Sequence, residues 1–165
     1  MRNRAGFIMI EVMVGLALVL IMVGITSAHI NAYRYTCMKQ QVALFALNWH
    51  QLQQSAMARN AQQEMILDEA QHRYQLEGVW HDLPTTLRFG FLPESKGPPS
   101  NPTTPIRSAI TFVQKKVICF PDGTIQAGTV YLIDDKKQSM YALTSGVSAV
   151  SFLRKYRYDG TWHGY

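Results

Sequence analysis

The chain lacks the motifs that mark the common classes of enzyme and metal site. Its five histidines include no His-x-x-x-His pair, its two cysteines form no Cys-x-x-Cys, and its serines have no Gly-x-Ser-x-Gly setting. A glycine-rich phosphate loop is also missing. We therefore expect no catalytic residue, no metal and no cofactor, and we expect that the protein is not an enzyme.

Cysteine and proline are scarce in ways that restrict the fold. Cys37 and Cys119 could form one disulfide in an oxidising compartment. Cys37 lies in an expected helix and Cys119 in a distant expected strand, so we expect two free or buried thiols instead. No proline precedes Pro84, so nothing in the first half of the chain interrupts a helix. Five of the seven prolines fall within residues 93–105, which predicts a long surface loop.

The most informative segment that is present lies at the N-terminus. Arg2 and Arg4 precede an almost unbroken apolar run from Phe7 to Ile25. As a helix this run spans roughly 30 Å, which is enough for one membrane crossing. The positive-inside rule predicts a cytoplasmic N-terminus, with the residues after about His29 on the other side of the membrane.

Glu11 is the acidic residue inside this run. A carboxylate in hydrocarbon costs about 2.5–3.5 kcal/mol, so Glu11 needs a partner or a neutral form. A signal-anchor helix would explain the apolar run but not the carboxylate. A secretory signal peptide cleaved after Ala28, which would release a soluble β-rich binding protein, leaves the carboxylate equally unexplained.

The sequence Gly-Phe-Ile-Met-Ile-Glu at residues 6–11 resembles the class III leader of type IV pilins and type II secretion pseudopilins. The resemblance implies that a prepilin peptidase cuts between Gly6 and Phe7 and N-methylates Phe7. It also implies that Glu11 pairs with the N-terminal amine of a neighbouring subunit. The implied partners are the peptidase, other pilins or pseudopilins of the same filament, an inner-membrane assembly platform and membrane lipid.

Four segments are expected along the chain: a leader at residues 1–6, a membrane or filament-core helix at 7–28, an amphipathic continuation at 29–60, and a head at 61–165. Apolar residues at spacings of three and four define the continuation: Met38, Val42, Phe45, Trp49, Leu52 and Ala56. Strand-like segments with turn residues between them follow at 64–69, 72–77, 86–92, 109–120, 129–133, 139–144 and 149–158. This order predicts an α+β fold, with one long N-terminal helix packed on an antiparallel β-sheet head.

Residues 52–60, 110–112, 118–123 and 127–130 are similar to the GspH/FimT-type minor subunits of these filaments. This narrower resemblance implies two sheets around the helix and a place near the tip of a type II secretion pseudopilus or a type IV pilus. The protein would be a single-pass inner-membrane protein with a periplasmic head. A competence pseudopilus is a third machine that the sequence leaves open, as it does the identity of any secreted substrate.

The C-terminal segment interleaves Arg154, Lys155 and Arg157 with Tyr156 and Tyr158. Cations beside stacking rings are typical of surfaces that bind single-stranded nucleic acid or a phosphate backbone. A DNA-binding minor pilin for DNA uptake is therefore an alternative function. The simpler interpretation is an edge strand whose Lys and Arg deter aggregation, with the aromatic residues packing below.

Overall fold

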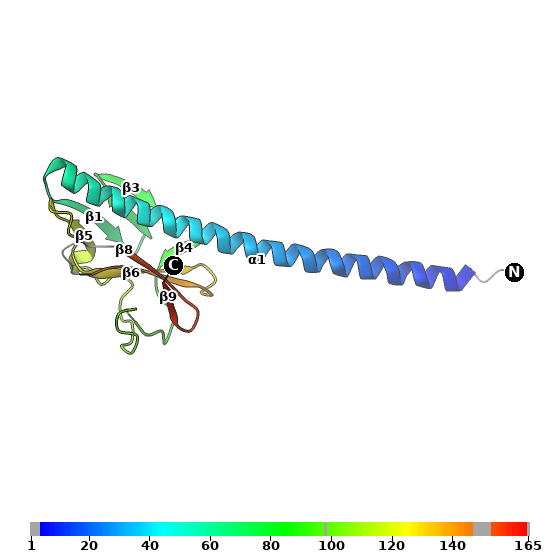
Figure 1. Cartoon of the computed structure of the whole chain (residues 1–165). Helices are drawn as coiled ribbons and strands as arrows, with labels where there is room; N and C mark the ends of the chain where they lie inside the picture. Colours follow the sequence, from blue (N-terminus) through cyan, green and yellow to red (C-terminus); the bar gives the residue numbers. More distant parts are fainter. Residues whose placement is uncertain (1–3, 98, 147–152, 165) are drawn as a thin grey trace. The chain divides into compact units, whose positions relative to one another are not determined.

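The computed structural model describes residues 4–97, 99–146 and 153–164. They belong to two compact units, Met1–Lys39 and Gln40–Tyr165. The helix α1 (Arg4–Arg59) is the described part of the first unit and the first element of the second (Figure 1). Its 56 residues contain no proline, so the long helix that the sequence predicts forms without a break.

Within the first unit, Met9–Thr26 is long and apolar enough to cross a membrane. The side chains of this stretch are exposed to the surroundings and do not pack inside the unit. In the core helix of a water-soluble domain, most of these apolar side chains would instead be covered by neighbouring elements. The N-terminal part of α1 is therefore a candidate membrane span by its length, composition and exposure.

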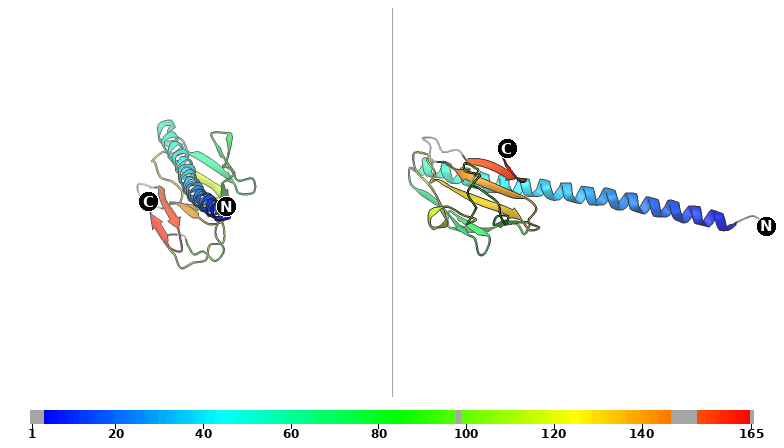
Figure 2. Two further views of the ribbon diagram at one scale, coloured as in Figure 1. Left: turned by 90° about the vertical axis from the view of Figure 1, so that its right-hand side faces the viewer. Right: turned by 90° about the horizontal axis from the view of Figure 1, so that it is seen from below.

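The second unit adds two antiparallel sheets to the C-terminal part of α1 (Figure 2). The first sheet has the order β3-β2-β1-β5, formed by β1 (Gln63–Asp68), β2 (Arg73–Leu76), β3 (Val79–Asp82) and β5 (Lys116–Cys119). The second has the order β4-β6-β7-β8-β9, formed by β4 (Leu87–Phe89), β6 (Gly128–Asp134), β7 (Met140–Ser145), β8 (Leu153–Tyr158) and β9 (Trp162–Gly164). The α+β class is confirmed, and the described residues form two sheets where the strand spacing predicts one.

The prediction of one strand over residues 109–120 is wrong. Ile110 makes an isolated bridge to Val130 in the second sheet, whereas β5 begins only at Lys116 and belongs to the first sheet. The short 3-10 helix η1 (Val113–Lys115) lies between them, and Gln114 has a φ of 54°. The chain changes sheets at this point, which a continuous strand would not allow.

The apolar stripe of α1 lies at the centre of the second unit and joins both sheets. The Phe45 ring contacts Tyr74 of β2 at a centroid distance of 5.1 Å and Phe89 of β4 at 6.1 Å. One turn further on, the Trp49 ring contacts Phe112 at 5.4 Å. Val42, Phe45, Trp49, Leu52 and Ala56 are each at most 2% exposed. Burial of this stripe contributes to the hydrophobic stabilisation of the head, together with the buried residues of both sheets.

A buried glutamine connects the end of α1 to Pro121-Asp122-Gly123, a sequence that predicts a turn between two strands. Gln53 donates from Nε2 to the carbonyl oxygen of Gly123 at 2.6 Å. Gly123 has a φ of +82°, and a Cβ added there would lie 2.9 Å from the sulfur of Met57. The turn that the sequence predicts therefore requires glycine for both its backbone conformation and its approach to the helix.

Replacing Gln53 by Leu should lower the free energy of unfolding by about 1–3 kcal/mol, because the buried carbonyl of Gly123 loses this donor. Chemical denaturation of the full chain in detergent, followed by circular dichroism, measures the change. Gln54→Leu on the exposed side of the same helix turn is the matched control and should stay within about 0.5 kcal/mol. Equal effects of the two variants would contradict this assignment.

Candidate functional site

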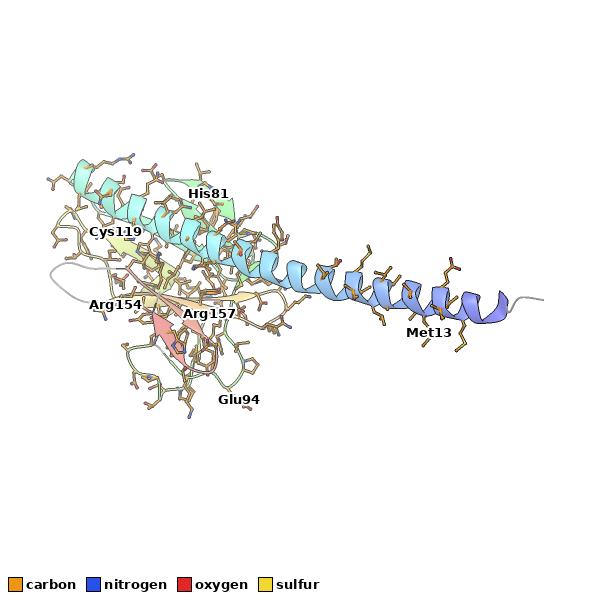
Figure 3. All side chains as sticks on the ribbon, turned by 45° about the vertical axis from the view of Figure 1, so that its right-hand side comes forward. Met13, His81, Glu94, Cys119, Arg154 and Arg157 are labelled. Atoms are coloured by element: carbon orange, nitrogen blue, oxygen red, sulfur yellow. The ribbon has the colours of Figure 1, made fainter. Side chains whose placement is uncertain are left out.

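Glu11 is the charged residue of the candidate span, whose other side chains between Met9 and Thr26 carry no formal charge. Its side chain is exposed, and it has no hydrogen-bond or ion-pair partner among the residues that the structure describes. Its neighbours Ile10 and Val12 are also exposed, so the carboxylate lies on an otherwise apolar helix surface. Figure 3 labels Met13, which is another exposed apolar residue of this part of the helix. In the hydrocarbon of a bilayer an unpaired carboxylate on this surface is costly.

Gly6 and Phe7 lie in the first turns of α1, shortly before Glu11. Residues four apart on a helix lie on one face, separated by about 6 Å along the axis. Cleavage between Gly6 and Phe7 would therefore create an amine one helical turn from the carboxylate. The positive end of the helix dipole favours Glu11 at this position but disfavours the new ammonium, which adds to the need for an anionic partner.

The exposed face of α1 in the second unit is uncharged, a feature that our reading of the sequence missed. No Asp, Glu, Lys or Arg occurs between Lys39 and Arg59. Leu44 and Leu47 on this face are 52% and 59% exposed. A helix face in contact with water normally carries charged or polar residues, and here His50, Gln51 and Gln54 supply only polar ones. This surface is therefore suited to contact with another neutral surface. The absence of Asp, Glu, Lys and Arg from this stretch could have been noticed in the sequence.

The interpretation of the C-terminal segment as an edge strand holds for only part of it. The strand β8 lies between β7 and β9, but β9 pairs only with Tyr156–Tyr158, and no described strand lies beside Leu153–Lys155 on that side. Sequence reasoning missed β9 because its three residues give too short a pattern to recognise. Residues 149–152, which the sequence assigned to the same strand, lie outside the described residues.

The three cations of the C-terminal segment do not form one patch. Successive side chains of a strand point to opposite faces of its sheet, so Lys155 and Arg157 share one face and Arg154 lies on the other. Tyr156 and Tyr158 lie on the face of Arg154 and pack against the cluster around Tyr131, Met140 and Ala142. Figure 3 shows Arg154 and Arg157 at separate places along β8.

The aromatic side chains of the C-terminal segment support the proline-rich loop. Trp162 packs against Tyr158 and Tyr131, with ring centroids 5.0 and 6.0 Å apart. Its Nε1 donates to the carbonyl oxygen of Lys96 at 2.7 Å, and Lys96 forms a bridge with Pro105 at the base of the loop. These rings are therefore engaged in packing and do not form an open stacking surface.

The thiols and potential metal ligands are dispersed. Cys37 and Cys119 are both free, as the sequence predicts. Burial raises the pKa of the Cys119 thiol to about 12, so it stays protonated near neutral pH. Across residues 4–97, 99–146 and 153–164, no group of three or more His, Cys, Asp and Glu side chains could hold a metal ion.

Comparison of the chain with protein-family models, curated proteins and solved structures finds no match. Two surfaces of the described chain remain as candidates for contact with other molecules. The first is the apolar surface of Met9–Thr26 that carries Glu11, and the second is the uncharged face of α1 between Lys39 and Arg59.

Proposed function

We propose that the chain is a minor pilin or pseudopilin of the inner membrane, with its N-terminus in the cytoplasm and its head in the periplasm. Prepilin peptidase removes residues 1–6 and methylates Phe7. The mature subunit then joins the tip region of a type II secretion pseudopilus or a type IV pilus. The observation that carries this proposal is the lone carboxylate of Glu11, one helical turn after the Gly6–Phe7 bond in an exposed apolar helix.

The proposed assembly contact is an ion pair that offsets the free-energy cost of dehydrating two charged groups. The Phe7 amine of a mature subunit and the Glu11 carboxylate of its neighbour each lose water when the helices pack together. Pairing them offsets this cost and fixes the axial register between the two helices. Each helix offers one amine and one carboxylate, so the same contact can be repeated from subunit to subunit along a filament.

The uncharged face of α1 supports the same proposal from the second unit. A neighbouring subunit can cover Leu44 and Leu47 without burying a formal charge, so packing along this part of the helix needs no second ion pair. DNA uptake has no comparable support, because Arg154 lies on a different face of β8 from Lys155 and Arg157. The proposal therefore concerns secretion or pilus biogenesis.

The N-terminal mass of the membrane-extracted protein tests the proposal. Co-expression with a prepilin peptidase should give a chain that starts at methylated Phe7, and expression without it should give the full-length precursor. Gly6→Val should lower the rate of cleavage at least roughly tenfold, which corresponds to about 1.4 kcal/mol of lost transition-state stabilisation. Ala5→Val, one residue earlier, is the control and should still be cleaved.

Two other masses would contradict the proposal. A chain that starts at His29 would identify a secreted soluble protein and would remove the filament mechanism. A chain that keeps Met1 in the presence of an active peptidase would identify a simple membrane-anchored head.

A further inference from the structure

The strand β3 forms an edge of the first sheet. Within the described part of the chain it pairs only with β2, and all four of its side chains are exposed. Val79 and Trp80 are 58% and 41% exposed, and Figure 1 shows β3 at the rim of its sheet. Natural edge strands usually carry lysine, proline or a bulge that blocks pairing with another strand. The four residues of β3 include no lysine or proline, and the one formal charge on this short strand is that of Asp82.

The register of the hairpin shows which backbone groups of β3 are free. Glu77 and Gly78 form a two-residue turn with φ values of 49° and 84°, as in a type I′ turn. The residues that flank such a turn exchange hydrogen bonds, and hydrogen-bonded pairs then alternate along the ladder. The bond from Leu83 N to the His72 oxygen at 2.9 Å fits this alternation. The N–H and C=O groups of Trp80 and Asp82 therefore point away from β2.

Contacts on the inner side hold this edge in place. Ser55 donates to Glu77 Oε1 at 3.1 Å, and Arg59 forms an ion pair with the same oxygen at 3.0 Å. The guanidinium of Arg73 lies 4.2 Å from the centre of the Trp80 ring. An edge that is ordered in advance loses less entropy when a partner strand binds.

The opposite edge of the same sheet is less available. Gln126 N donates to the Ile118 oxygen at 2.9 Å, and Ile125 bridges Cys119, so the following segment already occupies part of the free side of β5. An added strand would have to displace these contacts. On the outer side of β3 the described residues make no such backbone contact.

We infer that β3 pairs with β3 of a second copy of this chain, antiparallel and centred on His81. Trp80 and Asp82 flank His81, so a two-fold axis there places Trp80 opposite Asp82 of the second copy. That carboxylate then approaches the Arg73 guanidinium, which lies over Trp80 and pairs through Nε with Asp68 Oδ2 at 3.2 Å. Asp82 has no hydrogen-bond or ion-pair partner within the described part of its own chain. The charge complementarity occurs twice by symmetry, which favours a second copy over an unrelated strand.

Cysteine cross-linking of the full chain in lipid bilayers tests this pairing. In a Cys37→Ser background, His81→Cys places two thiols at a non-hydrogen-bonded antiparallel pair, where the Cα atoms are about 4.5 Å apart and a disulfide can form. Cys119 is fully buried and should not interfere. We expect a disulfide-linked dimer on mild oxidation. His163→Cys, an exposed position on β9, is the matched control and should stay monomeric.

Two further variants separate specific pairing from chance collision. Trp80→Pro removes an outward N–H and should reduce the His81→Cys dimer at least roughly tenfold while circular dichroism stays unchanged. Glu11→Ala should leave this dimer intact, because the contact does not depend on filament assembly. A His81→Cys chain that stays monomeric, links to a different protein, or dimerises no better than His163→Cys would overturn the inference.

Discussion

Replacing Glu11 by Ala should leave membrane insertion unchanged and lower incorporation into a filament by roughly a hundredfold. In the proposed filament, loss of this carboxylate would leave the Phe7 amine of the neighbouring subunit buried and unpaired, at a cost of about 2.5–3.5 kcal/mol. Each 1.4 kcal/mol changes an equilibrium about tenfold. Insertion itself is not impaired, because the substitution makes the span more apolar.

The measurement compares the amount of the protein in sheared filaments with the amount in the membrane fraction. Thr26→Ala is a suitable control, because Thr26 is the polar residue at the other end of the span and its hydroxyl only donates to its own helix, at Met22 O. Glu11→Asp keeps the charge and should restore part of the incorporation. Normal recruitment of Glu11→Ala into filaments would exclude the proposed pairing.

Replacing Trp49 by Ala should lower the free energy of unfolding of the head by about 3–5 kcal/mol. Trp49 is fully buried, and its ring packs edge-on against Phe45 at 6.3 Å and against Phe112 at 5.4 Å. Its Nε1 has no hydrogen-bond partner among the described residues, so the expected loss comes from packing and from the cavity left behind. This loss is a large part of the 5–15 kcal/mol that stabilises a typical domain.

Urea denaturation of the full chain in detergent, followed by far-ultraviolet circular dichroism, gives this free energy. Leu47→Ala on the same helix is the matched control, because Leu47 is 59% exposed and its loss should change stability by less than about 0.5 kcal/mol. A loss below about 1 kcal/mol for Trp49→Ala would mean that α1 does not organise the core of the second unit.

The helical part of the fold could be predicted because its signals are local. The absence of proline before Pro84 and the spacing of apolar residues from Val42 to Ala56 depend only on neighbours within a few turns. The same holds for the Pro-Asp-Gly turn, which the structure places against Gln53. The partner of that turn could not be predicted, since residues 53 and 123 are far apart in the sequence.

The candidate membrane span, the lone carboxylate of Glu11 within it and the α+β class could all be identified from the amino-acid sequence. The tertiary structure was needed to show that residues 109–120 divide between two sheets, that β9 covers part of β8, and that β3 is an edge. The reason is physical: apolar content and helical period are properties of a short segment. Sheet edges and strand faces depend instead on hydrogen bonds between residues that are distant along the chain.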